Sequence, residues 1–250
     1  MFARVGGKSL SRKMIDELIP EGETYIEPCV GGGSIYFEVK KGNKFKKYII
    51  NDLDKDVYDF YCDMLNYGDL MADMDYKPNK DKFWLLHGQI DMEAGPDRLH
   101  RNIYVNMNSF AGKRTSYIGP VKEAIVLNSK MTMGKKWKTN KWKKWLEGTI
   151  IKNECLMKII KESDNENAFF FIDPPYSANR ASWGYNHTEI NYDALNEILM
   201  ALKGKFILTL DDTPQNRDIF SSFELVTFTV RYTVNGAKRK YGSEILFKNY

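Results

Sequence analysis

Short apolar runs alternate with amphipathic segments in two stretches of the sequence. In the first stretch, residues 24–26 and 48–50 are apolar runs, and polar residues close each of them. Residues 34–39 have helical spacing, with Ser34 as the expected cap, and residues 54–65 place one apolar face on a second helix. That face holds Val57, Tyr58, Tyr61 and Leu65. The order strand, helix, strand, helix predicts the opening of a doubly wound sheet.

The second stretch begins at residue 168. Residues 168–172 and 206–210 are expected strands, and residues 191–202 form an expected helix that stops at Gly204. Another short helix is expected from Pro214. Residues 223–230 and 243–247 alternate as strands do, and Asn235 with Gly236 between them is typical of a hairpin turn.

The region between the two stretches has a different composition. It lacks clear strands and is rich in Lys, Arg, Asn, Met and Trp. Trp142 and Trp145 are three residues apart, so they are expected to share one helical face. We therefore predict a doubly wound α/β domain from residues 1–55 and 160–250, with a mostly helical insertion at 56–159.

Composition narrows the class of protein. Of the 250 residues, 43% are hydrophobic and 14% aromatic, which excludes a disordered chain. No apolar run reaches the ~20 residues of a membrane span, and the charged first 20 residues indicate no signal peptide. Three separated cysteines and three histidines predict neither a disulfide framework nor a metal site, and they favour a reducing compartment. The net charge of +4 permits a nucleic-acid partner.

A glycine-rich turn follows the first predicted strand, between Glu27-Pro28 and Ser34. Glycines let the chain turn sharply and let a ligand approach the backbone. The spacing matches neither GxGxxG nor a P-loop. A carboxylate at Glu27 would repel a pyrophosphate but suits an ammonium group, and S-adenosylmethionine carries an ammonium and a sulfonium. Asp52, after the second strand, suits ribose hydroxyls. An ordinary tight turn and a helix cap would also explain these residues.

A further candidate segment directly follows the apolar strand at 168–172, and its sequence is Asp173-Pro174-Pro175-Tyr176. Two prolines fix the chain and push each preceding residue to extended geometry. The loop would present a carboxylate, the Pro174 carbonyl and an aromatic face at the carboxyl end of a strand. Two acceptors and a stacking surface match an exocyclic amino group on a planar base. A strand followed by a proline turn with a surface tyrosine is the simpler alternative.

Taken in order along the chain, these segments resemble the Dam-type (D12 class) family of DNA adenine-N6 methyltransferases. The matching positions are Gly6-Gly7-Lys8-Ser9, residues 25–34, Asn51-Asp52, residues 173–176, residues 204–212, Arg239-Lys240 and residues 244–247. Both α/β stretches are covered, and the middle matches weakly. The sequence departs from the family at Arg4, where tryptophan is common, at Cys29, which replaces a phenylalanine, and at residues 153–156, where an Asp-Phe pair is usual.

The resemblance implies a Rossmann-like, S-adenosylmethionine-dependent methyltransferase that acts on N6 of a flipped adenine in double-stranded DNA. Asp173 and the Pro174 carbonyl would accept hydrogen bonds from N6, and Tyr176 would stack on the ring. The implied catalytic residues are Asp173, Pro174, Pro175 and Tyr176. The implied cofactor-binding residues are Arg4, Lys8, Glu27, Pro28, Gly31, Gly33, Ser34, Asp52 and Asp173. The helical insertion would then recognise the target sequence.

Candidate DNA contacts come from two further segments. Residues 106–114 resemble the family's hairpin motif, in which Phe110 would fill the gap left by the flipped base. Lys113 and Arg114 could reach phosphates or a guanine edge, and an ordinary hairpin with solvated cations is the alternative. Beside the predicted hairpin turn near the carboxyl end of the chain, a second basic group could contact the backbone, or be a solvated turn: Lys238, Arg239 and Lys240.

Other substrates remain compatible with the residues. N4 of cytosine is also an exocyclic amine, although Asp173 favours adenine, and RNA adenine would offer the same N6. A non-catalytic DNA-binding protein on this scaffold is a further alternative, which intact Glu27, Asp52 and Asp173 disfavour. We expect a monomeric enzyme, cytoplasmic or nucleoid-associated, with no membrane and no metal partner.

Overall fold

The computed structural model describes residues 8, 11–109, 114–119, 141–176, 190–232 and 240–250. The chain divides into two compact units. The sheet unit comprises Gly6–Asp54 and Gly148–Tyr250, and the helical unit comprises Met1–Val5 and Lys55–Glu147. The helical unit is therefore an insertion within the sequence of the sheet unit, apart from its first five residues.

A seven-stranded, mostly parallel sheet organises the sheet unit, in the order β3-β2-β1-β4-β5-β7-β6. Strands β3, β2, β1, β4 and β5 run parallel, and β7 is antiparallel to both of its neighbours. The order along the chain reverses between β1 and β4, which makes their carboxyl ends the switch point where such folds bind ligands. The strands are β1 (Gly22–Glu27), β2 (Phe45–Asn51), β3 (Thr149–Lys152), β4 (Ala168–Ile172), β5 (Lys205–Asp211), β6 (Glu224–Tyr232) and β7 (Lys240–Lys248).

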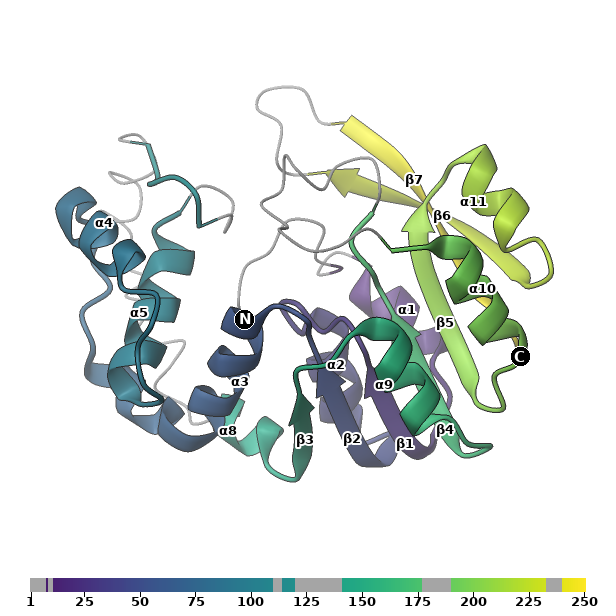
Figure 1. Ribbon diagram of the computed structural model, residues 1–250, viewed down its shortest axis with the longest axis horizontal. Helices are drawn as coiled ribbons and strands as arrows, with labels where there is room; N and C mark the ends of the chain where they lie inside the picture. The colour runs from purple at the N-terminus through teal and green to yellow at the C-terminus, as the bar shows by residue number, and fades with distance from the viewer. Residues whose placement is uncertain (1–7, 9–10, 110–113, 120–140, 177–189, 233–239) are drawn as a thin grey trace. The chain divides into compact units, whose positions relative to one another are not determined.

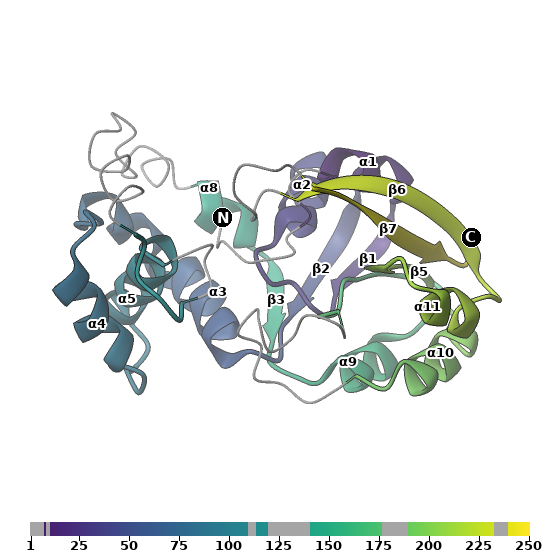
Figure 2. The ribbon, with the colours of Figure 1, turned by 90° about the horizontal axis from the view of Figure 1, so that it is seen from above.

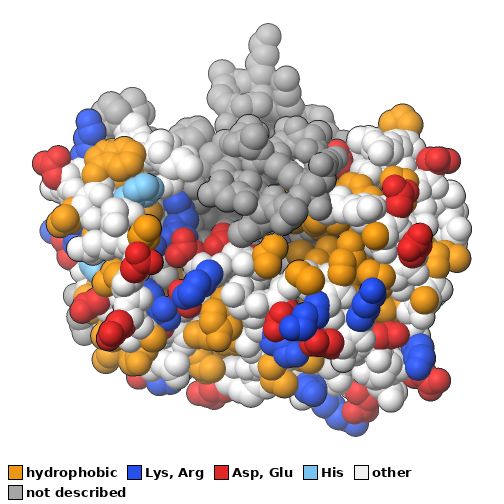
Figure 3. All heavy atoms as spheres, in the orientation of Figure 1, with side chains coloured by type: hydrophobic (Ala, Val, Ile, Leu, Met, Phe, Trp, Pro, Cys, Tyr) orange, Lys and Arg blue, Asp and Glu red, His pale blue; other side chains and the backbone are white. Residues whose placement is uncertain are grey.

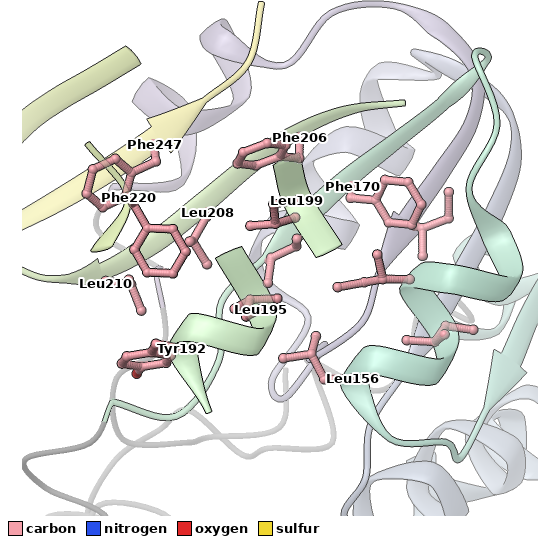
Figure 4. Packing of buried hydrophobic residues seen from close by; sticks show 14 of the residues in the cluster. Leu156, Phe170, Tyr192, Leu195, Leu199, Phe206, Leu208, Leu210, Phe220 and Phe247 are labelled. Atoms are coloured by element: carbon pink, nitrogen blue, oxygen red, sulfur yellow. The ribbon is translucent and has the colours of Figure 1, made fainter. Parts of the chain in front are cut away.

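Helices cover both faces of this sheet. Helices α1 (Arg12–Leu18) and α2 (Ser34–Gly42) lie on one face, and α9 (Leu156–Ser163), α10 (Tyr192–Met200) and α11 (Pro214–Ile219) lie on the other (Figures 1 and 2). Strand residues alternate between the faces, so Phe170 joins the cluster under α9–α11 while Phe169 packs against Tyr25 and Phe45 on the opposite side. Figure 4 shows the first cluster, with Leu195 and Leu199 of α10 directed at Phe206 and Leu208 of β5.

The described part of the helical unit consists of α3 (Lys55–Tyr67), the 3₁₀ helix η1 (Gly68–Asp73), α4 (Lys80–Gly88), α5 (Pro96–Met107) and α8 (Lys141–Leu146). Helices α3 and α5 are joined by a buried ion pair, because Arg98 donates to both carboxylate oxygens of Asp63 at 2.7 and 2.9 Å. The second carboxylate, Asp59, lies 3.1 Å from the same guanidinium. Two acids around one arginine therefore join α3 and α5 through charge-assisted hydrogen bonds.

The predicted α/β fold is confirmed, and several local predictions need correction. Residues 149–152 lie in the region expected to lack strands, yet they form β3 beside β2. Ser34 is the first residue of α2 and caps nothing, because Gly33 holds the cap position. On α3 the buried apolar residues are Val57, Phe60, Tyr61 and Met64, whereas Tyr58 and Leu65 are half-buried. The predicted turn at Asn235-Gly236 lies outside the described residues.

Candidate active site

The glycine turn connects β1 to α2 at the carboxyl edge of the sheet. Gly31 and Gly33 have positive φ angles of 46° and 68°, a region that disfavours residues with a Cβ. The Gly31 N–H donates to Asp52 Oδ2 at 2.8 Å, and the Gly33 N–H donates to the Val30 carbonyl at 2.7 Å. Asp52 thus joins the end of β2 to the turn after β1.

The hydrogen bonds of the Gly31 and Gly33 N–H groups indicate which charge a ligand of this turn should carry. A turn that binds phosphate directs free N–H groups at the anion. Here Asp52 and Val30 already accept from Gly31 and Gly33. Glu27, Asp52 and Asp173 lie close enough that the charges of Asp173 and Asp52 both act on Glu27. This acidic edge fits a cationic, hydroxyl-bearing ligand such as S-adenosylmethionine better than a pyrophosphate.

Glu27 is buried beneath the turn. The Tyr25 hydroxyl donates to its Oε2 at 2.6 Å. Burial raises the pKa of the Glu27 carboxyl well above its usual range, and the neighbouring charge of Asp173 adds to the rise while the bond from Tyr25 opposes it. A nearby cation would favour the ionised carboxylate, so the site gains from a positively charged ligand.

Asn51 joins three segments of this edge, a role that the sequence did not indicate. Its Nδ2 donates to the Pro28 carbonyl at 2.8 Å and to the Glu154 carbonyl at 2.9 Å. Its Oδ1 accepts from the Glu154 N–H at 2.9 Å. The side chain is 1% exposed, so β2, the start of the glycine turn and the segment before α9 are held together from one buried amide. The Glu154 carboxylate itself pairs with Lys158 at 2.8 Å.

The second half of the site is the Asp173–Tyr176 loop, which follows β4. Asp173 Oδ1 accepts from the Thr209 hydroxyl at 2.7 Å and lies 2.8 Å from Lys8 Nζ. Pro174 is buried and Pro175 half-buried, so the loop packs against the sheet unit. Thr209, on the neighbouring strand β5, is a site residue that sequence reasoning missed, because its position beside Asp173 depends on the β4–β5 register.

Lys8 is enclosed by acidic and aromatic groups. Its ammonium lies 4.8 Å from the centroid of the Tyr176 ring and 3.6 Å from Glu244 Oε2. Burial alone would lower the pKa of Lys8, but Asp173, Tyr176 and Glu244 outweigh it and hold this pKa well above its usual range. Lys8 is therefore a buried cation at the end of β4, and Tyr176 is 5% exposed beneath it.

The predicted DNA contacts are only partly described. Arg114 has a positive φ of 65°, and its guanidinium donates to Asp56 at 2.7 Å and to Asn102 at 3.1 Å. In this arrangement Arg114 is held inside the helical unit, and its contact with DNA stays a prediction. Lys240 begins β7 opposite Tyr232, but its side chain is not described. The other predicted DNA contacts lie outside the described ranges: Phe110, Lys113, Lys238 and Arg239. Arg4, a predicted cofactor-binding residue, also lies outside them.

Charges on the described surface are mixed. Figure 3 shows Lys and Arg side chains interspersed with Asp and Glu on the face it presents. Within the described ranges, no helix is long and apolar enough to cross a membrane. The same residues contain no cluster of three His, Cys, Asp or Glu that could hold a metal ion.

The reversed strand order, with acidic loops at the switch point, defines a Rossmann-like α/β fold. Residues 5–234 match the model of the D12 class N6 adenine-specific DNA methyltransferases. The chain belongs to this family, and its activity is site-specific methylation of adenine in DNA.

Curated relatives and solved structures extend the comparison. The type II methyltransferase M.CviBI of Paramecium bursaria Chlorella virus NC1A is 23% identical over 260 residues, covering 98% of this chain and 97% of the relative. M.MjaIII of Methanocaldococcus jannaschii, also a type II methyltransferase, is 24% identical over 291 residues, covering 98% and 96%. A precorrin-6y C5,15-methyltransferase from Geobacter metallireducens GS-15 is similar in structure with a TM-score of 0.42 at 6% identity, covering 100% of this chain and 93% of that chain.

Proposed function

We propose that this chain transfers the methyl group of S-adenosylmethionine to N6 of an adenine flipped out of double-stranded DNA. The observation that carries the proposal is the position of Asp173, at the carboxyl end of β4 and on the acidic edge shared with Glu27 and Asp52. When bound, S-adenosylmethionine supplies an electrophilic methyl group. Lys8, Glu27, Asp52 and the glycine turn would hold it, together with Arg4, Pro28 and Ser34.

Asp173 would orient the attacking nitrogen. Its contacts with Lys8 and Thr209 both fall on Oδ1, which leaves Oδ2 for one N6 proton of adenine. The Pro174 carbonyl would accept the second proton, and Pro175 would keep that carbonyl in place. Two fixed acceptors direct the lone pair of N6 at the methyl group, and the carboxylate stabilises the positive charge that develops on N6.

This chemistry does not require a strong general base. The amine attacks in its neutral form, and a proton leaves N6 after the transfer. A tyrosine face would stabilise the flipped base by stacking, worth ~1–3 kcal/mol. Tyr176 is buried here, so stacking requires that its ring face becomes exposed when the base enters.

The helical unit would recognise DNA. We assign sequence recognition to residues 55–147, with Phe110 filling the gap left by the flipped base. Lys113 and Arg114 would contact phosphates or a guanine edge, and Lys238–Lys240 would contact the phosphate backbone. Because its substrate is DNA, we infer that the enzyme works inside the cell, in the cytoplasm or at the nucleoid. If lysines neutralise phosphates, the affinity for duplex DNA falls steeply as salt rises, and an affinity that does not change with salt would contradict this interface.

The decisive test is methylation of unmethylated genomic DNA by the purified protein with S-adenosylmethionine, read by single-molecule sequencing. We expect N6-methyladenine within one short motif. Asp173→Ala should abolish transfer in a tritiated-cofactor assay and Tyr176→Ala should reduce it severely, while Asp193→Asn on the exposed start of α10 serves as the control. N4-methylcytosine, or wild-type rates from both site variants, would refute the proposal.

A further inference from the structure

Strand β7 brings a second carboxylate to the proposed catalytic loop. Glu244 lies opposite Asp211 in the β5–β7 register, and Leu246 lies opposite Thr209. Directly opposed residues point to the same face of a sheet, and so do residues two apart on one strand. Glu244 therefore shares a face with Thr209, the residue that donates to Asp173.

Burial of this carboxylate calls for a physical reason. Glu244 is 3% exposed, on a strand with neighbours on both sides. An ionised carboxylate in such a position is costly unless it is paired. Its Oε2 has no hydrogen-bond partner within the described part of the chain, and the Lys8 ammonium lies 3.6 Å away. Burial raises the pKa of Glu244 and the charge of Lys8 opposes the rise, while the charge of Asp173 adds to it and the Tyr176 hydroxyl lowers it.

The charges around Lys8 show what the second carboxylate adds. With Asp173 alone, the ammonium would neutralise the group that must stabilise positive charge on N6. When Asp173 and Glu244 are both ionised, their two carboxylates and the one ammonium leave a net negative charge. Glu244 is a second acidic neighbour of the same ammonium, and the contacts of Lys8 and Thr209 with Asp173 both fall on Oδ1.

We propose that Glu244 is a positioning residue of the methyl-transfer site, which acts through Lys8 to fix Asp173 and to keep the site negatively charged. This inference rests on the proposed function of Asp173 and assigns a role to a residue outside the motif loops. Glu244 touches neither substrate nor cofactor in this role.

The test compares Glu244→Gln, which keeps the shape of the side chain and removes its charge, with Glu224→Gln. Glu224 is an exposed carboxylate on β6 that pairs with Lys248, so it provides the same chemical change away from the site. For Glu244→Gln we expect kcat to fall roughly 10- to 100-fold while KM for DNA and for the cofactor changes less than about threefold. Glu224→Gln should match the wild type. Glu244→Asp, which keeps the charge, should recover part of the loss.

A double-mutant cycle separates action through Lys8 from a general structural effect. If Glu244 works through Lys8, the loss caused by Glu244→Gln should largely disappear in a Lys8→Met background. If the fold-losses in kcat of the two single variants multiply in the double variant, or if Glu244→Gln has the kcat of the wild type, the proposal is overturned.

An NMR titration tests the same link without any activity. In the ligand-free protein labelled at the lysine ε-carbon, Lys8 should titrate well above the exposed lysines, and Glu244→Gln should lower its pKa. An unchanged titration of Lys8 would overturn the inference whatever the enzyme's substrate. Absence of adenine methylation by the wild type would instead remove the proposed function, so the two failures can be told apart.

Discussion

Replacing Asn51 tests whether one buried amide holds the cofactor edge together. In Asn51→Ala three hydrogen bonds are lost, two to the carbonyls of Pro28 and Glu154 and one from the Glu154 N–H. At about 0.5–1.5 kcal/mol each, with buried partners left unsatisfied, the free energy of unfolding should fall by about 2–4 kcal/mol. For a chain of this size that corresponds to a Tm roughly 5–15 °C lower.

Two measurements test the effect of Asn51→Ala on stability and on cofactor binding. Scanning calorimetry gives the Tm of the sheet unit, and isothermal titration gives the affinity for S-adenosylmethionine, which should weaken about tenfold because the turn at Pro28 loses its anchor. Asn66→Ala is the control, since Asn66 is exposed on α3 and makes one bond to the Cys62 carbonyl. Asn51→Asp should be as harmful as alanine, because an oxygen would then face two carbonyl oxygens.

The refuting result is specific. If Asn51→Ala and Asn66→Ala have the same Tm and the same cofactor affinity as the wild type, the three bonds of Asn51 do not stabilise this edge. If Asn51→Asp is stable while Asn51→Ala is not, then side-chain volume rather than amide donation is responsible.

Three further predictions concern single side chains. Because burial raises the pKa of Glu27, binding of a cationic ligand should release a proton from this carboxyl. Cofactor affinity should therefore tighten as pH rises above the usual carboxyl range and level off above the raised pKa. Calorimetry in buffers of different ionisation enthalpy would measure the released proton, and Glu27→Gln should bind the cofactor weakly at every pH. Thr209→Val removes the 2.7 Å bond to Asp173 and should lower kcat about tenfold with little change in Tm; an unchanged kcat in single-turnover assays would contradict that role. Arg98→Leu leaves Asp63 buried and unpaired, and should destabilise the helical unit by about 3–5 kcal/mol in denaturant titrations, whereas a change below 1 kcal/mol would argue against the pair.

The fold was largely accessible from the sequence because its strands are short, apolar and closed by turn residues. Residues 168–172 are buried throughout β4, which gives the continuous apolar run expected of an inner parallel strand. β3 was missed because it lies at the sheet edge, where Ile150 is exposed and Lys152 half-buried, so no clear apolar run appears.

The candidate site was predictable only where its residues lie at strand ends or in the loops that follow. Glu27, Asp52 and Asp173 each follow or end a predicted strand, so their position at one edge follows from a parallel sheet. Thr209 and Glu244 lie within strands, and their proximity to Asp173 depends on the order β4-β5-β7. Local sequence patterns carry no information on that order, because β7 lies between β5 and β6 in the sheet although it follows both of them along the chain.

The placement of β7 also determines when an active enzyme can arise during translation. Strand β1 has no β4 partner until the whole helical unit has been synthesised, since Tyr25 pairs with Phe169. Residue 248 must then leave the ribosome before β7 can occupy its place beside β5, because Lys248 pairs with Ile207. A chain interrupted before residue 244 would contain Lys8 and Asp173 without the second carboxylate. Incomplete translation products are therefore expected to lack methylating activity. DNA should be methylated only by chains in which β7 has paired with β5.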